Sequence, residues 1–302
     1  MVDDSSHSLY TGCLIRTRLP HLEKSARAIF DRFGIKFSDL EGASCCPDPF
    51  GMRAMNQETW LTMAARNLAL ARNNSHPLMT LCSGCYSTFR HAEHILTKDS
   101  SLQEKINHNL RGIGYQYLPG ILIEHFARFI FEKIGITQLR LQITESWKGL
   151  PVAVHNGCHF LRPSHIIGFD DPENPTKLEE LVRVLGAEVI DYPQKMICCG
   201  FPIQGVDAEL SLQMAYEKLR LMKECGAKAV IVVCPACYLQ FDVGQRAIEQ
   251  RFDVSLELPV FYLTEFIGLA LGLNPLSLGL NFHRVDAISL IRKTFPEQDS
   301  GD

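Results

Sequence analysis

The chain has 302 residues, 46% of them apolar and 21% charged, an ordinary balance for a soluble globular protein of one or two domains. A formal net charge of −4 gives no reason to expect a nucleic-acid surface, and no apolar run is long enough to predict a membrane span. The first residues, MVDDSSHSLY, are acidic and polar, unlike a secretory signal, so we expect a cytoplasmic protein.

The first half of the chain alternates between helical and strand-like segments. Apolar side chains at helical spacing predict a helix over 22–33, closed by Gly34, and a short apolar segment follows at 35–37. A long amphipathic helix is predicted over 57–73 and a compact strand over 78–81. The order of these elements is typical of an α/β protein.

Three segments connect this half to the next. The polar stretch 97–111 predicts an exposed helix or loop, 121–134 predicts a helix, and 137–149 predicts a linker. Because similar elements then follow in similar order, we expect two domains, residues 1–149 and 150–302.

The second half repeats the pattern of the first. Its predicted elements are a strand at 152–154, a helix at 178–185 closed by Gly186, an apolar segment at 187–190, a helix at 209–224, a strand at 229–233 and a closing helix at 260–272. The sequence therefore predicts an α/β fold of two duplicated modules. Each would contain a small, mostly parallel sheet flanked by helices, with cysteine-bearing loops at the carboxyl ends of the strands.

Ten of the eleven cysteines form two copies of one pattern: a single cysteine, an adjacent pair, and Cys-x-x-Cys after a strand. The first copy comprises Cys13, Cys45, Cys46, Cys82 and Cys85, and the second comprises Cys158, Cys198, Cys199, Cys234 and Cys237. Cytosolic thiols are normally kept reduced, and a secreted disulfide scaffold would be shorter. Reduced cysteines clustered in this way point to a metal.

Three kinds of site are compatible with these residues. A thioredoxin-like redox pair needs only one Cys-x-x-Cys and leaves the other cysteines unexplained. Structural zinc is saturated by four ligands, so one cysteine in each module would remain. An iron–sulfur cluster takes thiolate ligands, and adjacent cysteines can each bind an iron of one cluster, so this interpretation is favoured although the bacterial ferredoxin run is absent.

The chain also resembles the B subunit of heterodisulfide reductase, a family of cysteine-rich CCG domains, over about residues 9–285. The segments that carry the resemblance are EGASCCP, TWLTMAARNLALA, CSGCY, GCHFLRPS, DDPENPTKLEELV and PACYLQFDVGQ. The resemblance implies two noncubane [4Fe-4S] clusters, each held by five thiolates. Carried over motif by motif, one cluster would be held by Cys13, Cys45, Cys46, Cys82 and Cys85, and the other by Cys158, Cys198, Cys199, Cys234 and Cys237.

The resemblance further implies a catalytic subunit that cleaves the coenzyme M–coenzyme B disulfide to two thiols between the clusters, as in the heterodisulfide reductases of methanogens. Its partners would be a ferredoxin-like C subunit and a flavin-bearing A subunit. Two other functions remain open: a subunit of a sulfur-oxidising complex acting on a sulfur carrier, and a CCG-type electron-transfer subunit. A structural zinc protein remains the simplest alternative.

Several residues near the cysteines are candidates for direct roles. His159, beside Cys158, could donate a proton to a departing thiolate or could be a hydrogen-bonded structural histidine. His155 is more consistent with a structural role. Arg162 and Lys195 could bind anionic groups of a substrate, although such residues are more often simply solvated.

Other residues have expected structural roles. Cys225 and Trp60 are expected to pack in the core, whereas the cluster loops are expected to be shaped by Gly200, Gly205, Pro47 and Pro49. The loop Phe201-Pro202-Ile203 departs from the glycine-rich run of the family. It would be stiffer and more apolar, so it bears on which substrate fits.

Overall fold

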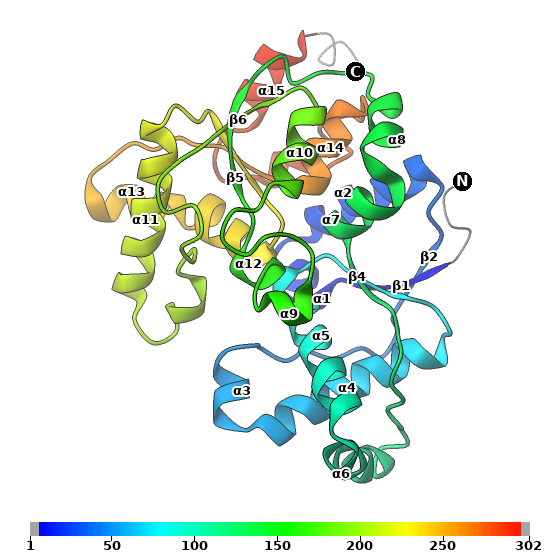
Figure 1. The fold of residues 1–302 in the computed structure, drawn as a ribbon. Helices are drawn as coiled ribbons and strands as arrows, with labels where there is room; N and C mark the ends of the chain where they lie inside the picture. The colour runs from blue at the N-terminus through cyan, green and yellow to red at the C-terminus, as the bar shows by residue number, and fades with distance from the viewer. Residues whose placement is uncertain (1–5, 297–302) are drawn as a thin grey trace.

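The computed structural model describes residues 6–296 and contains two four-stranded parallel sheets (Figure 1). The first has the order β2-β1-β3-β4 and consists of β1 (His7–Tyr10), β2 (Phe37–Asp39), β3 (Leu78–Thr80) and β4 (Ile123–His125). The second has the order β6-β5-β7-β8 and consists of β5 (Pro151–His155), β6 (Glu188–Ile190), β7 (Ala229–Val232) and β8 (Val260–Tyr262). The identical orders and parallel pairing confirm the predicted duplicated α/β fold.

Helices flank the first sheet. They are α1 (Gly12–Arg18), α2 (Pro20–Phe33), α3 (Gly51–Met55), α4 (Gln57–Asn73), α5 (Ser83–Lys98) and α6 (Ser100–Arg111). The predicted helix 57–73 is confirmed: the Asn56 side chain accepts the N–H of Thr59 and caps its first turn, and Trp60 is fully buried on its inner face. The polar stretch near residue 100 is helical, and Ile106 and Leu110 anchor it to the core.

The second sheet has a similar set of helices. They are η2 (Cys158–Phe160), α9 (Ser164–Ile167), α10 (Lys177–Val184), η3 (Phe201–Ile203), α11 (Ala208–Glu224), α12 (Pro235–Tyr238), η4 (Leu239–Val243), α13 (Gln245–Phe252), α14 (Leu263–Ala270), η5 (Leu280–Phe282) and α15 (Ile288–Thr294). Asp207 caps α11 by accepting the N–H of Leu210, as Asn56 caps α4. The predicted helices 178–185 and 209–224 are confirmed to within one residue.

Three predicted segments were wrong in part. Residues 121–134 do not form one helix, because Ile123–His125 pair with β3 before α7 (Phe126–Phe129) and the π-helical turn η1 (Ile130–Ile134) begin. The predicted linker contains α8 (Gly135–Gln142), and the predicted closing helix begins as strand β8. Short apolar runs fit a buried strand or a helix equally well, and pairing with a neighbouring strand decides between them.

None of the helices within residues 6–296 is both long and apolar enough to cross a membrane. Residues 143–147 lie against α14: the N–H groups of Thr144 and Glu145 donate to the carbonyl of Ala270, and the Trp147 ring stacks on Phe266 at 4.0 Å. The division into domains at residues 149 and 150 stays a prediction.

The two modules are joined by buried polar contacts between α2 and α14, which lie side by side (Figure 1). The hydroxyls of Ser25 and Thr264 are hydrogen-bonded. Close by, His283 Nε2 lies 3.0 Å from a carboxylate oxygen of Glu265, and both side chains are almost fully buried. Glu265 also accepts the backbone N–H of Tyr262 at 2.8 Å, so one carboxylate both caps α14 and binds the loop after η5.

Glu265→Gln is expected to destabilise the protein in a pH-dependent way. Burial lowers the pKa of His283, but the Glu265 carboxylate more than offsets this and raises it above the ordinary value. A raised folded-state pKa contributes stability that is complete below the pKa of the unfolded state and is lost as pH rises through the folded pKa. We expect a loss of about 3 kcal/mol at pH 6, the range for breaking a buried pair, and a smaller loss at pH 9.

Urea unfolding of both proteins at the two pH values measures this difference. Glutamine can still accept the Tyr262 N–H, so the helix cap is retained. The exposed Glu180→Gln is the control and should change stability little at either pH. An E265Q deficit that is equal at pH 6 and pH 9 would show that the ion pair contributes nothing.

Candidate metal centre

The strand order brings the cysteines together. In each parallel sheet, successive strands are added first on one side of the starting strand and then on the other, so the strand order reverses between the two central strands. Ligands of such folds bind at the carboxyl ends of the strands at this point. Cys13 and Cys82 follow the central strands β1 and β3 of the first sheet. Cys158 and Cys234 follow β5 and β7 of the second, so each module presents its cysteines at the equivalent place.

Glycines allow these loops to approach one another closely. Gly12 and Gly157, which precede the first cysteine of each set, both have φ of +75°. A Cβ at position 12 would lie 3.0 Å from Cys85 Sγ, closer than such contacts normally are. Gly200, after the second adjacent pair, has φ of +87°, and a Cβ there would lie 2.7 Å from the carbonyl oxygen of Ser211. Glycine is therefore required at positions 12 and 200.

One cavity of about 420 Å³ is lined by residues of both modules. All ten cysteines of the two sets line it, namely Cys13, Cys45, Cys46, Cys82, Cys85, Cys158, Cys198, Cys199, Cys234 and Cys237. The eleventh, Cys225, lies outside it and is exposed, so the expectation that it packs in the core was wrong. The repeat in the sequence therefore corresponds to one shared site.

In the first set, every thiol contacts at least one other thiol. Cys45 interacts with both Cys13 and Cys46, and Cys46 interacts in turn with Cys85. Cys82 lies beside Cys85 in the same set. Together, these contacts connect all five thiols of the first module.

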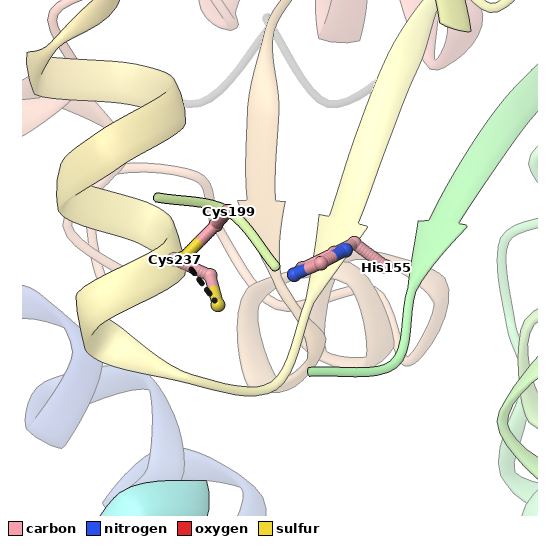
Figure 2. A group of neighbouring side chains, drawn as sticks. All are labelled: His155, Cys199 and Cys237. Atoms are coloured by element: carbon pink, nitrogen blue, oxygen red, sulfur yellow. Dashed lines mark hydrogen bonds between the residues drawn. The ribbon is translucent and has the colours of Figure 1, made fainter. Parts of the chain in front are cut away.

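In the second set, Cys198 interacts with Cys158 and Cys199. The sulfur atoms of Cys199 and Cys237 lie 3.4 Å apart (Figure 2). A disulfide bond is about 2.05 Å long, so these are separate thiols, and all eleven cysteines are free. The two sets meet where Cys82 lies beside Cys234.

Thiolates are favoured at particular positions. Interactions with the Cys45 and Cys85 thiols lower the pKa of Cys46, and interactions with Cys158 and Cys199 lower the pKa of Cys198. Their neighbour Cys13 has a raised pKa, because its thiol interacts with Cys45 and because it is partly buried. Each adjacent pair therefore contains one cysteine with thiolate character, the form that binds metal.

His155, at the end of β5, directs its ring toward Cys199 and Cys237 (Figure 2). One of its nitrogens and the two sulfur atoms all lie within 4.8 Å of one another. Burial lowers the pKa of His155 to about 3, so the ring is neutral. Among residues 6–296 neither ring nitrogen has a hydrogen-bond partner, although the side chain is buried. A buried N–H needs an acceptor, and the Cys199 and Cys237 sulfur atoms would supply one if they bind a metal as thiolates.

His159 lines the cavity and bridges the two modules. Its Nδ1 lies 3.1 Å from the hydroxyl of Ser87 on α5, and its ring packs edge-on against Phe50 at 4.5 Å. Burial lowers the pKa of His159. With Nδ1 directed at Ser87, Nε2 is the nitrogen that can reach a molecule in the cavity.

Two further candidates from the sequence, Arg162 and Lys195, lie outside the cavity. Arg162 donates to the carbonyl of Pro172 and pairs with Glu173, and Lys195 pairs with Glu179 and Asp191. Neither lines the cavity, and within residues 6–296 its lining contains no lysine or arginine. The suggestion that Arg162 or Lys195 binds anionic substrate groups at the cavity is therefore not supported.

The loop residues lie nearer the site. Phe201 and Pro202 line the cavity, as do Pro49 and Gly205, whereas Ile203 does not. The Pro47 carbonyl accepts a hydrogen bond from the hydroxyl of Thr88 on α5. Sequence reasoning missed Asn67 and Lys218, which hold the loops of the adjacent pairs. Asn67 and Lys218 occupy equivalent positions in the two long helices, and this equivalence was the signal in the sequence that could have identified them.

Comparisons with known proteins show which family the chain belongs to. A family model described as a cysteine-rich domain, CCG, matches residues 8–90 and 152–242. The B subunit of ferredoxin:CoB-CoM heterodisulfide reductase from Methanosarcina mazei is 35% identical, over 95% of this chain and 96% of the relative. The 8-methylmenaquinol:fumarate reductase membrane anchor subunit of Wolinella succinogenes is 30% identical, over 94% and 98%.

A solved structure supports the fold. The crystal structure of a hypothetical protein from Helicobacter pylori superposes with a TM-score of 0.79 at 17% identity. The match covers 95% of this chain and 53% of that one, so this chain spans about half of the solved protein. At this identity the likeness shows the shared fold alone.

Proposed function

Because the chain belongs to the cysteine-rich CCG family and to the B subunits of the heterodisulfide reductase type, we propose that its ten cavity cysteines hold two iron–sulfur clusters at which a disulfide is reduced. The observation that carries this proposal is the single cavity lined by all ten thiols. A cavity shared by both sets lets one substrate reach both sites at once.

The donor set fits such clusters. Sulfur is the usual ligand of iron–sulfur centres, and five thiols of each module converge with no disulfide among them. Neither His155 nitrogen has a partner in the described chain, and one of them lies within 4.8 Å of the Cys199 and Cys237 sulfur atoms, so cluster-bound thiolates there would accept its N–H. We assign Cys13, Cys45, Cys46, Cys82 and Cys85 to one noncubane [4Fe-4S] cluster. The other would be held by Cys158, Cys198, Cys199, Cys234 and Cys237.

The proposed reaction takes up two electrons and two protons and converts one disulfide into two thiols. The clusters would supply the electrons one at a time. The chain itself would orient the disulfide between its two cysteine sets, and Phe201 and Pro202, which line the cavity, would restrict the space beside it. His159 Nε2 would deliver a proton to one departing sulfur, while Ser87 holds the ring by its other nitrogen. Solvent would supply the second proton, to the other sulfur.

We propose the coenzyme M–coenzyme B disulfide as the substrate, since a relative 35% identical over 95% of this chain is named for it. Its anionic ends would extend beyond the cavity, because the lining residues include Asp48 and no cation within the described chain. Electrons would come from partner subunits, a ferredoxin-like C subunit and a flavin-bearing A subunit, as expected for a B subunit of such a complex.

A second candidate function is electron transfer without disulfide cleavage. The Wolinella relative, similar over almost its whole length, is named as a subunit of a quinol:fumarate reductase. The same pair of sites could then pass electrons to or from a partner. An oxidative role on a sulfur carrier is the third possibility, and the cysteine geometry is the same for all three.

The test is anaerobic purification of the full chain followed by iron and sulfide counts and a reduction assay with a viologen dye. The proposal expects about eight irons, two [4Fe-4S] clusters, and turnover of the coenzyme M–coenzyme B disulfide. A colourless protein that contains zinc would overturn the cluster assignment. Full clusters without turnover of this disulfide would reject the substrate and favour the electron-transfer or sulfur-carrier function.

A further inference from the structure

The two cysteine sets are built alike but differ in one buried charge. The long helices α4 and α11 each follow one of the adjacent pairs in the chain. The first turn of each is capped by the side chain of the residue before it, Asn56 or Asp207. Asn67 comes ten residues after the first residue of α4, and Lys218 comes ten residues after the first residue of α11. The duplicated fold therefore places an amide and an ammonium at equivalent positions.

Asn67 holds the loop before Cys46 through neutral hydrogen bonds. Its Nδ2 donates to the carbonyl of Cys45 at 3.0 Å, and its Oδ1 accepts the backbone N–H of Ser44 at 2.9 Å. The side chain is fully buried. This anchor fixes the first adjacent pair without adding charge.

Lys218 holds the equivalent loop with a charged group. Its Nζ donates to the carbonyls of Gln194, Lys195 and Ile197 at 3.0, 3.0 and 2.8 Å, so all three ammonium hydrogens are used immediately before Cys198. The residue is 4% exposed. Burial lowers the pKa of Lys218 to about 8, which leaves the ammonium as the main form at pH 7.

The charge of Lys218 has no carboxylate partner within residues 6–296. The Tyr192 ring lies 5.6 Å from Lys218 Nζ and adds a cation–π contact. A buried cation without a counterion is costly, so the negative charge of the neighbouring thiolates must balance it. As cluster-bound thiolates, Cys237, Cys199 and Cys198 would act on Lys218 with this sign.

Other charges do not cancel the difference. Lys195, in the same loop, is neutralised by Glu179 and Asp191. Near the first set, Arg16 and Asp48 are exposed, and water screens exposed charges strongly. Within residues 6–296, Lys218 therefore places a buried charge behind the second adjacent pair, where the first pair has the neutral Asn67.

We propose that Lys218 gives the two sites different reduction potentials. The site with the more positive potential would be the one formed by Cys158, Cys198, Cys199, Cys234 and Cys237. This inference rests on the proposed clusters. A fixed positive charge stabilises the form that carries one more electron, and buried charge acts with little screening. The second site would be reduced first and the first site second, which gives the pair a defined order.

The test is a redox titration followed by electron paramagnetic resonance on the full chain with its clusters, without substrate. Cys45→Ser and Cys198→Ser proteins each keep one site, so their potentials can be compared directly. We expect the site left in C45S to be reduced at the more positive potential, by at least tenfold in the equilibrium constant, about 59 mV for one electron. Equal or inverted potentials would overturn the proposal.

Two further variants assign the effect to Lys218. Lys218→Met should lower the potential of the second site and leave that of the first unchanged, whereas Lys218→Arg should restore it. Unchanged potentials in K218M with full iron would refute the role of Lys218. If K218M loses iron, Asn67→Lys, which adds the charge to the first site, should raise that site's potential, and no rise would refute the proposal. Because the titration uses no disulfide, a failed reduction assay would reject the proposed function and leave this result standing.

Discussion

Cys198→Ser is expected to remove about half of the iron and sulfide, and Cys45→Ser the other half, because each belongs to a different five-thiol set. Disulfide reduction should fall at least about 100-fold in either variant, since each retains only one of the two sites that border the cavity. Iron and sulfide counts with electron paramagnetic resonance measure the first effect, and the viologen-coupled assay measures the second.

Cys225→Ser is the matched control, because Cys225 is exposed and lies outside the cavity. It should retain full iron and full activity. Loss of all iron in C45S and C198S alike would show that the two sets form one indivisible site. Retention of all iron in both variants would refute the assignment of these cysteines as ligands.

His159→Ala is expected to lower the rate of disulfide reduction by about 10²–10⁴-fold, the usual range for losing a positioned acid or base. Iron content should be unchanged, because His159 is not among the ten thiols. The loss should appear in kcat more than in KM, since a proton to the departing sulfur matters in the transition state. Steady-state kinetics at several pH values measure both.

Ser87→Ala gives a graded comparison. It removes the hydroxyl 3.1 Å from His159 Nδ1 and should lower the rate less than H159A, because the ring loses its orientation and keeps its proton. An H159A protein with full iron and wild-type kcat would show that the histidine only fills space against Phe50.

Much of the site was predictable from spacing. The pattern of single cysteine, adjacent pair and Cys-x-x-Cys, repeated after equivalent strands, identified all ten cysteines that line the cavity. It also predicted the duplication, because both halves run through the same elements in the same order. Parallel α/β modules place loops that follow their central strands at one edge, so such residues can be grouped from sequence alone.

Other features depended on contacts between segments far apart in the chain. The strand Ile123–His125 was predicted as helix because a run of three apolar and polar residues carries no period of its own. The role of Lys218 was missed for a similar reason: in a helix pattern it looks like an ordinary solvated lysine, and only the loop at Gln194–Ile197 folding over it removes it from water.

By itself, the sequence determined which residue types form the site and that they come in two equivalent sets. Cysteine spacing and strand–helix alternation are local properties, so they survive without knowledge of the fold. Only the tertiary structure decided that Cys82 of one set meets Cys234 of the other and that both sets border one cavity. It also decided which charges are buried there, because burial depends on packing between the modules, which no local pattern encodes.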